Sequence, residues 1–321
     1  MSMPVGLFGN FFNRNAIWRV QMSKKVGVVG LGAMGGIYVR HLMSAGFKVA
    51  GYDLIEDYVG ALKKLGMEAC QSPKEVAEAS DVLITSLPSY TALESVIQGD
   101  KGILEAGKEA LIIIDTCTLK VEDKLAIGES VSAAGMFFLD APISGTPPMV
   151  ENREASLYIG GDKKAYEQCK DIIEAFTGTN FYVGNVGDAS KMKILANYLV
   201  GVHTVAAAEC MVLGIKAGLD PNLIHEVLPK GAGGSKMLEV RGEYMAKSDY
   251  RYDEGTIFNV IQKDSSIISE YAASLNSPIN LFASARQTFN SAVALGLSHM
   301  ELAAVCKAVE ISAGVDRPLI E

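Results

Sequence analysis

Residues 25–35 read Lys-Val-Gly-Val-Val-Gly-Leu-Gly-Ala-Met-Gly, and this stretch decides the fold. Its first half is a short apolar run that is rich in β-branched residues and ends in glycine, as expected for a buried parallel strand. A helix-length segment follows at 33–45, and Gly46 ends it. Residues 48–52 form the next expected strand. This opening therefore predicts a β-α-β unit with a glycine-rich turn between the first strand and the helix.

The glycine turn indicates a dinucleotide site, because a GxGxxG pattern has that meaning when it follows a strand and opens a helix. Gly30 permits the tight turn, Gly32 lets the backbone approach a pyrophosphate, and Gly35 lets the helix pack closely on the strand. The amino end of the helix adds free N–H groups and partial positive charge. The predicted cofactor contacts in the turn are Gly30, Leu31, Gly32, Ala33, Met34 and Gly35.

Asp53, at the end of the second expected strand, indicates which dinucleotide binds. A carboxylate there accepts hydrogen bonds from the ribose hydroxyls and repels a 2′-phosphate. Leu54, Ile55 and Glu56 come next, so no arginine stands ready to bind that phosphate. The sequence therefore favours NAD over NADP, with Asp53 and Leu54 beside the ribose.

The pattern of expected helices and strands changes near residue 187. Before it, helix-like and strand-like stretches alternate, which predicts an α/β fold with a Rossmann-type doubly wound sheet. The stretches after the first two strands are 58–65, 76–79, 82–86, 111–115, 121–134 and 137–140. After it, long segments rich in Ala, Leu, Ile, Lys and Glu continue to residue 311. We predict a dinucleotide-binding domain at 25–187, an all-helical substrate and oligomerisation domain at 188–321, and a disordered extension at 1–24.

Charge and composition narrow the function classes. A net charge of −8 argues against a broad nucleic-acid surface. The five cysteines are scattered and the four histidines lack ligand spacing, so we expect no disulfide framework and no metal site, in a reducing compartment. Residues 194–219 are apolar, but Asn197, His203 and Glu209 interrupt them, which favours a buried helix over a membrane span.

The amino-terminal segment leaves two localisations open. No Asp or Glu precedes Asp53, and the opening carries Arg14, Arg19, Lys24 and Lys25. A basic, acid-free start is typical of a mitochondrial presequence. We favour a short extension on a cytoplasmic protein and keep the mitochondrial matrix as the alternative.

With Met34 in the fifth place of the glycine loop, the chain resembles the β-hydroxyacid dehydrogenase family, and the resemblance runs from about residue 25 to 317. Two segments are similar to strand ends that line the cofactor in this family. They are Thr-Ser-Leu-Pro at 85–88 and Asp-Thr-Cys-Thr at 115–118. The resemblance implies cofactor contacts at Leu87, Pro88 and Thr118, and it implies that Lys263 closes over the cofactor from the helical domain.

Residues 140–145, Asp-Ala-Pro-Ile-Ser-Gly, resemble the substrate loop of the family. The resemblance implies that Ser144 and Gly145 hold the substrate carboxylate, with Thr146 beside them. A serine hydroxyl and adjacent N–H groups at a strand end also form a small anion-binding concavity. Residues 146–154 depart from the family because two prolines stiffen them, and this leaves the identity of the substrate open.

Residues 187–197 resemble the family pattern GxGxxxKxxxN, with alanine in the second glycine position. This register makes Lys193 the catalytic lysine and places Asn197 on the same face of a helix. Burial would lower the lysine pKa from about 10.4 toward about 7–8, a useful range for proton transfer. We expect Lys193 to move the proton, Asn197 to position the substrate hydroxyl, and the nicotinamide to accept the hydride.

These features predict NAD-dependent, reversible oxidation of a small 3-hydroxy acid to a semialdehyde or keto acid. The expected partners are a small anionic substrate and further copies of the chain, in a homodimer or homotetramer, but neither nucleic acid nor membrane. Three alternatives stay open: a semialdehyde reductase in vivo, an imine reductase, and a non-catalytic NAD-binding interaction protein. The resemblance weighs against the last two, because such relatives usually lack the lysine that stands here at Lys193.

Overall fold

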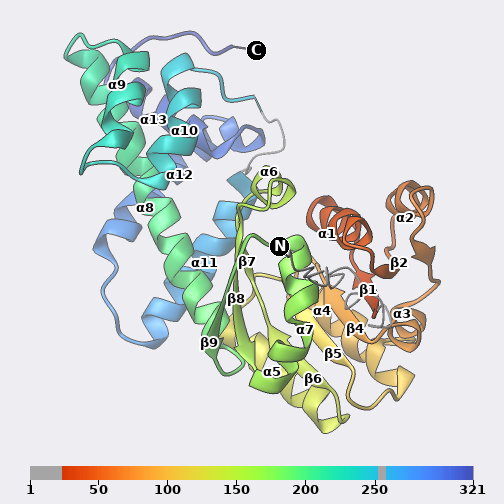
Figure 1. Cartoon of the computed structure of the whole chain (residues 1–321). Coiled ribbons are helices and arrows are strands. Elements are labelled where there is room, and N and C mark those ends of the chain that lie inside the picture. Colours follow the sequence, from red (N-terminus) through yellow and green to blue (C-terminus); the bar gives the residue numbers. More distant parts are fainter. Residues whose placement is uncertain (1–23, 252–257, 321) are drawn as a thin grey trace, which may run out of the picture.

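A computed structural model of the chain describes residues 24–251 and 258–320, and a nine-stranded sheet forms the centre of its amino-terminal half (Figure 1). The strand order is β3-β2-β1-β4-β5-β6-β8-β7, and β9 pairs with β8. Strands β1 to β6 are parallel. The strands are β1 (Lys25–Val29), β2 (Lys48–Tyr52), β3 (Glu68–Ala69), β4 (Val82–Thr85), β5 (Ile112–Asp115), β6 (Phe137–Asp140), β7 (Ile143–Ser144), β8 (Ser156–Gly161) and β9 (Thr179–Gly184).

Helices cover both faces of this sheet, so the predicted doubly wound fold is confirmed. Side chains along β1 alternate between two apolar clusters: Val28 packs with α1 and α7 on one face, and Val29 packs with α3, α4 and α5 on the other. The chain order reverses between β1 and β4, and sheets of this type bind ligands in a crevice at the carboxyl ends of the strands at such a switch point. The helices are α1 (Ala33–Ser44), α2 (Glu56–Lys63), α3 (Pro73–Ala79), α4 (Tyr90–Gln98), α5 (Val121–Ala133), α6 (Pro147–Glu151) and α7 (Lys163–Phe176).

The sheet is mixed at one side, which the sequence reading did not anticipate. Strand β8 runs antiparallel to both β6 and β7, while β9 runs parallel to β8. Gly160 of β8 packs directly against the backbone just before α8, because a Cβ at this position would lie 2.2 Å from the carbonyl oxygen of Asn185. The close approach brings the end of the sheet directly against the start of the helical half.

Every described element after Gly187 is helical, as predicted from the loss of strand-like stretches after that residue. The predicted extension at 1–24 lies outside the described residues, apart from Lys24. The helices are α8 (Asp188–Lys216), α9 (Pro221–Val227), α10 (Lys236–Lys247), α11 (Phe258–Ser274), α12 (Asn280–Ala294) and α13 (Val305–Ser312), with short 3-10 turns at Leu228–Lys230, Leu297–His299 and Leu302–Ala304.

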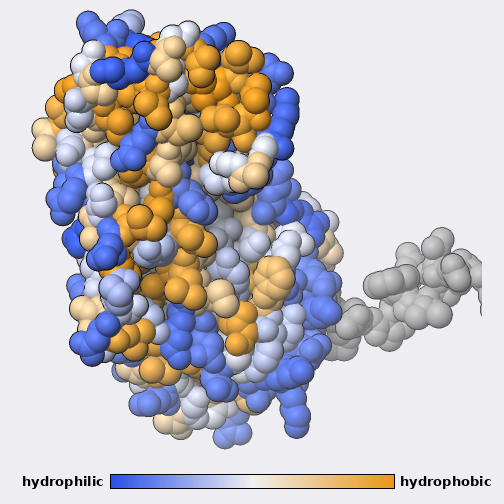
Figure 2. All heavy atoms as spheres, turned by 90° about the vertical axis from the view of Figure 1, so that its left-hand side faces the viewer, coloured by the Kyte–Doolittle hydropathy of each residue, from blue (hydrophilic) through white to orange (hydrophobic). Residues whose placement is uncertain are grey.

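Helix α8 packs against the other long helices of the helical half, and its lower end in Figure 1 reaches the sheet. By length and composition it could cross a bilayer, a test that core helices also pass. Here Val205, Ala208 and Met211 of α8 join the core of the helical half. Apolar side chains also gather on the outer face of the molecule (Figure 2), and Leu195 and Leu213 are exposed large apolar residues of α8.

Candidate active site

The glycine turn places the amino end of α1 at the carboxyl edge of the sheet. Gly30 has φ +89° and could not carry a side chain, because a Cβ would lie 2.2 Å from the carbonyl oxygen of Ser86. A Cβ on Gly35 would lie 1.9 Å from the carbonyl oxygen of Gly30, so strand and helix meet backbone to backbone. These contacts explain the positions of both glycines in the predicted turn.

Gly32 serves a different purpose from the other two glycines. A Cβ there would meet only the ring of Tyr58, at 3.8 Å, so the backbone borders open space. Gly32 is also the N-cap of α1, and no side chain caps the first turn. The N–H groups at the start of a helix have no partners within the helix and carry partial positive charge. The site therefore fits the diphosphate of a dinucleotide.

The carboxylate of Asp53 fastens this turn to the loop after β2. Its Oδ2 accepts a hydrogen bond from the Leu31 N–H at 2.6 Å, and its Oδ1 accepts one from the Ile55 N–H at 2.8 Å. Each oxygen retains a second lone pair for another donor. The side chain of Leu54, the next residue, is 85% exposed.

A hollow of about 380 Å³ lies beside the glycine turn. It is bounded by the turn itself, by one face of α1, by α2 and by α6. The lining residues are Leu31, Gly32, Ala33, Gly36, Ile37, Arg40, Tyr58, Ala61, Leu62, Pro147 and Glu151.

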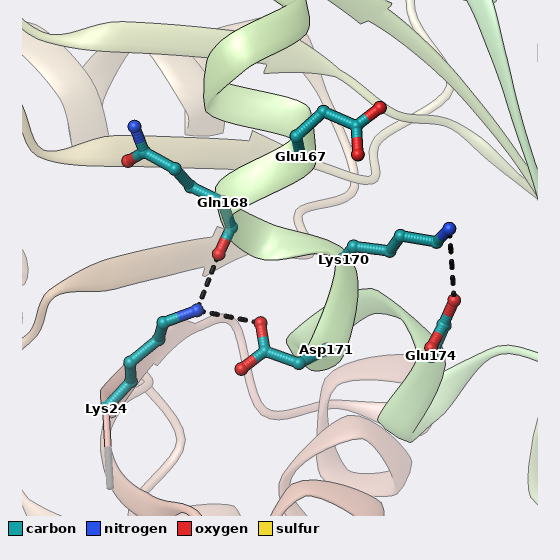
Figure 3. A pocket seen from close by; sticks show the side chains of 6 residues that line it. All are labelled: Lys24, Glu167, Gln168, Lys170, Asp171 and Glu174. Atoms are coloured by element: carbon teal, nitrogen blue, oxygen red, sulfur yellow. Dashed lines mark hydrogen bonds and ion pairs between the residues drawn. The ribbon is translucent and has the colours of Figure 1, made fainter. Parts of the chain in front are cut away.

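A larger hollow, of about 590 Å³, lies elsewhere, over α7 (Figure 3). Lys24 in its wall donates to Asp171 at 2.8 Å, and Lys170 pairs with Glu174 at 3.9 Å. Because Lys24 precedes β1 whereas the glycine turn follows that strand, the two hollows lie at opposite edges of the sheet. The residues over α7 are solvated ion pairs, so we place the candidate site at the glycine turn.

The loops after β4 and β5 are tied together beside the crevice. The N–H of Leu87 donates to Sγ of Cys117 at 3.1 Å, and Pro88 is exposed at the loop surface. The carbonyl oxygen of Thr118 accepts a hydrogen bond at 3.1 Å from Nζ of Lys263, which belongs to α11. The predicted contacts Leu87, Thr118 and Lys263 thus come together where the sheet and the helical half meet.

Lys193 lies in the second turn of α8 and is 8% exposed. Burial lowers the pKa of Lys193 to about 8, although the nearby carboxylate of Asp264 acts in the opposite direction. Lys191, two residues earlier, points to solvent and pairs with Asp188 at 2.9 Å. The structure therefore separates the two lysines as the sequence register predicts.

Asn197 follows Lys193 by one turn, and Asp264 of α11 faces it. Nδ2 of Asn197 donates to Oδ2 of Asp264 at 2.7 Å. Oδ1 of Asp264 is buried and accepts no hydrogen bond from the described residues, while Nζ of Lys263 lies 3.8 Å from it. Burial raises the pKa of Asp264. Lys193, Asn197, Lys263 and Asp264 form a polar cluster between α8 and α11.

The predicted substrate loop lies next to this helix, because α8 packs against both β7 and β8. Ser144 ends β7 and pairs with Ser156 of β8. Gly145 follows where a Cβ would lie 2.6 Å from that of Ala155, and Thr146 is the N-cap residue of α6. The fold therefore brings the predicted carboxylate-binding strand end against α8, the helix that carries Lys193.

A buried ionic cluster holds the start of α8 against the strand ends. Lys124 of α5 is fully buried and pairs with Asp115 at the end of β5 and, at 3.1 Å, with Asp140 at the end of β6. Asp140 accepts three hydrogen bonds from α8 and its preceding residue: from the Gly187 N–H, the Ser190 N–H and the Ser190 hydroxyl. Asp140 thus caps α8 from outside the helix.

The charge balance of this cluster keeps Lys124 protonated. Burial opposes the ammonium form, but the carboxylates of Asp115 and Asp140 outweigh it and raise the pKa of Lys124. The cluster fixes the end of α8 that carries the candidate catalytic lysine.

The sequence reading missed Lys124, Asp264 and Cys117 as parts of the site. Asp264 had a signal, since it directly follows Lys263, which the family resemblance places over the cofactor. Lys124 had none, because a single lysine in a helix is normally a solvated residue. Only the packing of α5 over the ends of β5 and β6 reveals its role.

Comparison with known proteins gives one consistent result for both halves of the chain. Residues 25–184 match the model of the NAD-binding domain of 6-phosphogluconate dehydrogenase, and residues 187–309 match the NAD-binding domain of NADP-dependent 3-hydroxyisobutyrate dehydrogenase. The chain is 31% identical to 2-(hydroxymethyl)glutarate dehydrogenase of Eubacterium barkeri, over 92% of this chain and 98% of that protein.

Two further relatives agree with these matches. The chain is 32% identical to L-threonate dehydrogenase of Cupriavidus necator, over 92% of this chain and 99% of that protein. The crystal structure of 3-hydroxyisobutyrate dehydrogenase from Salmonella typhimurium superimposes with a TM-score of 0.79 at 27% identity, over 89% of this chain and 99% of that one. The family matches extend through both halves of the fold and include α8, which carries both Lys193 and Asn197.

Proposed function

This chain belongs to the β-hydroxyacid dehydrogenase family, and from that premise we propose that it oxidises a small 3-hydroxy acid to the semialdehyde or keto acid with NAD. The chain is an NAD(P)-binding oxidoreductase. Three finer points are our proposal: the preference for NAD, the substrate class and the catalytic role of Lys193.

The burial of Lys193, on the helix that packs against the predicted substrate strand end, carries the proposal. A lysine with a pKa of about 8 is partly neutral near physiological pH and can both accept and return a proton. We assign to Nζ of Lys193 the removal of the proton from the substrate hydroxyl during oxidation and its return during reduction. Asn197 and Asp264, joined by a hydrogen bond, hold α8 and α11 together around Lys193.

The substrate would bind as an anion. The Ser144 hydroxyl and the backbone N–H groups of Gly145 and Thr146 supply donors for a carboxylate at the end of β7. A hydroxyl on the third carbon of a short acid would then reach toward α8. The names of two relatives, 2-(hydroxymethyl)glutarate and L-threonate dehydrogenase, agree with an acid that carries a hydroxyl.

Bound nicotinamide dinucleotide supplies the hydride acceptor in this chemistry. The chain holds it with the uncapped amino end of α1, the space over Gly32 and the carboxylate of Asp53. The free lone pairs of Asp53 suit the ribose hydroxyls, while its charge repels a 2′-phosphate. We therefore propose NAD as the preferred form.

The apolar surface of the helical half supports a further proposal of self-association into a homodimer or homotetramer. Leu195 and Leu213 of α8 are 57% and 71% exposed. Apolar residues gather on the face that Figure 2 shows, and a large apolar surface often marks an interface. Light scattering at several protein concentrations measures the assembly. A monomer at all of them contradicts the proposal.

A substrate panel tests the proposed function. Three- to five-carbon 2-hydroxy and 3-hydroxy acids, with NAD or NADP, are followed by absorbance of the reduced nicotinamide. Turnover of a 3-hydroxy acid with NAD, lost by more than a hundredfold in Lys193→Ala, is expected from general acid–base catalysis. Lys191→Ala is the matched control and should retain full activity. Activity of Lys193→Ala within a few-fold of the wild type contradicts the assignment.

A further inference from the structure

The hollow beside the glycine turn contains one cationic side chain among its lining residues, Arg40 of α1. Ala33, Gly36, Ile37 and Arg40 follow one another at helical spacing and form the wall that α1 contributes. The same wall begins at the uncapped amino end of the helix. Arg40 therefore shares a cavity with the backbone groups that fit a diphosphate.

The guanidinium of Arg40 lies back along α1 toward that amino end. Its Nη1 would be 3.7 Å from a Cβ on Gly36, which stands one turn nearer to the glycine turn. Gly36 is costly in a helix interior, by about 1 kcal/mol relative to alanine. The absence of its side chain leaves the surface between Arg40 and the turn open.

Glu151 of α6 orients the guanidinium from the other side of the hollow. Its Oε2 accepts a hydrogen bond from Nη2 of Arg40 at 2.5 Å. The ring of His41 contacts the carbonyl oxygen of Val150 at 3.2 Å, which holds α6 on α1 independently of the ion pair. Nε and Nη1 of Arg40 have no hydrogen-bond partner among the described residues, so these donors are free for an anion.

We propose that Arg40 binds the diphosphate of the dinucleotide, with Glu151 as its positioning residue. The inference rests on the proposed function, which places the dinucleotide at the glycine turn. A dinucleotide diphosphate carries two negative charges, and the amino end of α1 offers only about half a positive charge. The Arg40 guanidinium shares its charge with the Glu151 carboxylate, but it adds positive charge to the hollow and can donate two hydrogen bonds to phosphate oxygens.

Fluorescence titration with NADH and calorimetric titration with ADP-ribose test this contact without turnover. Both ligands carry the diphosphate, and only NADH carries the nicotinamide. Arg40→Met should raise the Kd of both ligands by about tenfold, as expected for one charged hydrogen bond at a partly exposed site. Arg40→Lys should recover part of the affinity, since it keeps the charge and loses the paired donors.

Lys48→Met is the matched control. It removes the same charge from the same domain, but Lys48 begins β2 at the opposite edge of the sheet. The proposal is overturned by unchanged affinities in Arg40→Met, by a loss confined to NADH, or by an equal loss in Lys48→Met. Thermal unfolding shows whether the variants are folded. A wild-type chain that binds neither ligand overturns the proposed function itself.

Discussion

Asn197 donates a hydrogen bond from Nδ2 to Oδ2 of Asp264 at 2.7 Å, and this contact joins the helix that carries Lys193 to α11. One of the two N–H donors of the amide group is therefore committed to a carboxylate. Only Oδ1 of Asn197 and its second N–H are left for a substrate hydroxyl. Asp264 also raises the pKa of Lys193 against the effect of burial. The pair thus sets both the position and the acidity of the candidate base.

The first prediction concerns the pH dependence of oxidation. Neutral Lys193 accepts the proton, so kcat/KM should rise with pH and level off above about pH 8. Asp264→Asn removes a charge that favours the ammonium form, so the midpoint should move to lower pH by about one unit. Asp171→Asn, a surface change on α7, should leave the midpoint in place. An unchanged midpoint in Asp264→Asn contradicts the electrostatic role.

The second prediction is that loss of the lysine stabilises the fold. Its pKa falls from 10.5 to about 8 on folding, so between these values the unfolded chain binds the extra proton and stability rises with pH. The full penalty is present below pH 8. Lys193→Met should therefore raise the free energy of unfolding at pH 7 by about 2 kcal/mol, and by less at pH 10. Urea unfolding at both values measures this, with exposed Lys191→Met as the control.

The third prediction concerns the buried cluster beneath α8. Lys124→Met leaves the carboxylates of Asp115 and Asp140 buried without their cation, at a cost of about 3–5 kcal/mol. The double variant Lys124→Met, Asp115→Asn should recover part of that loss because one uncompensated charge is removed. Lys120→Met breaks only an exposed pair with Glu270, so about 1 kcal/mol or less is expected. Equal losses in Lys124→Met and Lys120→Met argue against the cluster.

The fourth prediction concerns cofactor choice. Asp53→Asn keeps an oxygen that can accept from the N–H of Leu31, but it removes the charge that repels a 2′-phosphate. The ratio of kcat/KM with NAD to that with NADP should fall by about tenfold or more. Parallel assays with the two cofactors give this ratio. A ratio that stays the same assigns the carboxylate a purely structural role in the turn.

Much of the fold could be predicted because local patterns and tertiary packing agree. The strand at residues 48–52 is found with the predicted bounds, and the helix predicted at 33–45 ends one residue earlier. The helices and strands of residues 143–184 were not predicted. For β7 the reason is physical, since it has only two residues and pairs antiparallel with β8. Short strands of this kind are defined by their partners rather than by their own sequence.

The candidate site was predictable to the extent that its residues form linear motifs. Lys193 and Asn197 stand four residues apart in one helix, so their spacing reveals a shared face. Lys124, Asp115 and Asp140 come from three elements that the sheet brings together. A lone lysine in a helix is normally expected to be exposed to solvent. Only the structure shows that Lys124, Asp115 and Asp140 are all buried and paired.

The last prediction separates the roles of two glycines in the same turn. Gly35→Ala forces a Cβ to within 1.9 Å of the carbonyl oxygen of Gly30, so strand and helix must move apart and the chain should lose several kcal/mol of stability. A Cβ at Gly32→Ala meets only the ring of Tyr58, at 3.8 Å, and the φ of −64° at this N-cap suits alanine. The free energy of unfolding of Gly32→Ala should therefore lie within about 1 kcal/mol of the wild-type value. Its methyl group nevertheless enters the space assigned to the diphosphate, so the Kd for NADH should rise by more than tenfold. Thermal unfolding and NADH titration of both variants measure the two effects separately. Normal NADH binding by a stable Gly32→Ala protein would show that the diphosphate lies elsewhere.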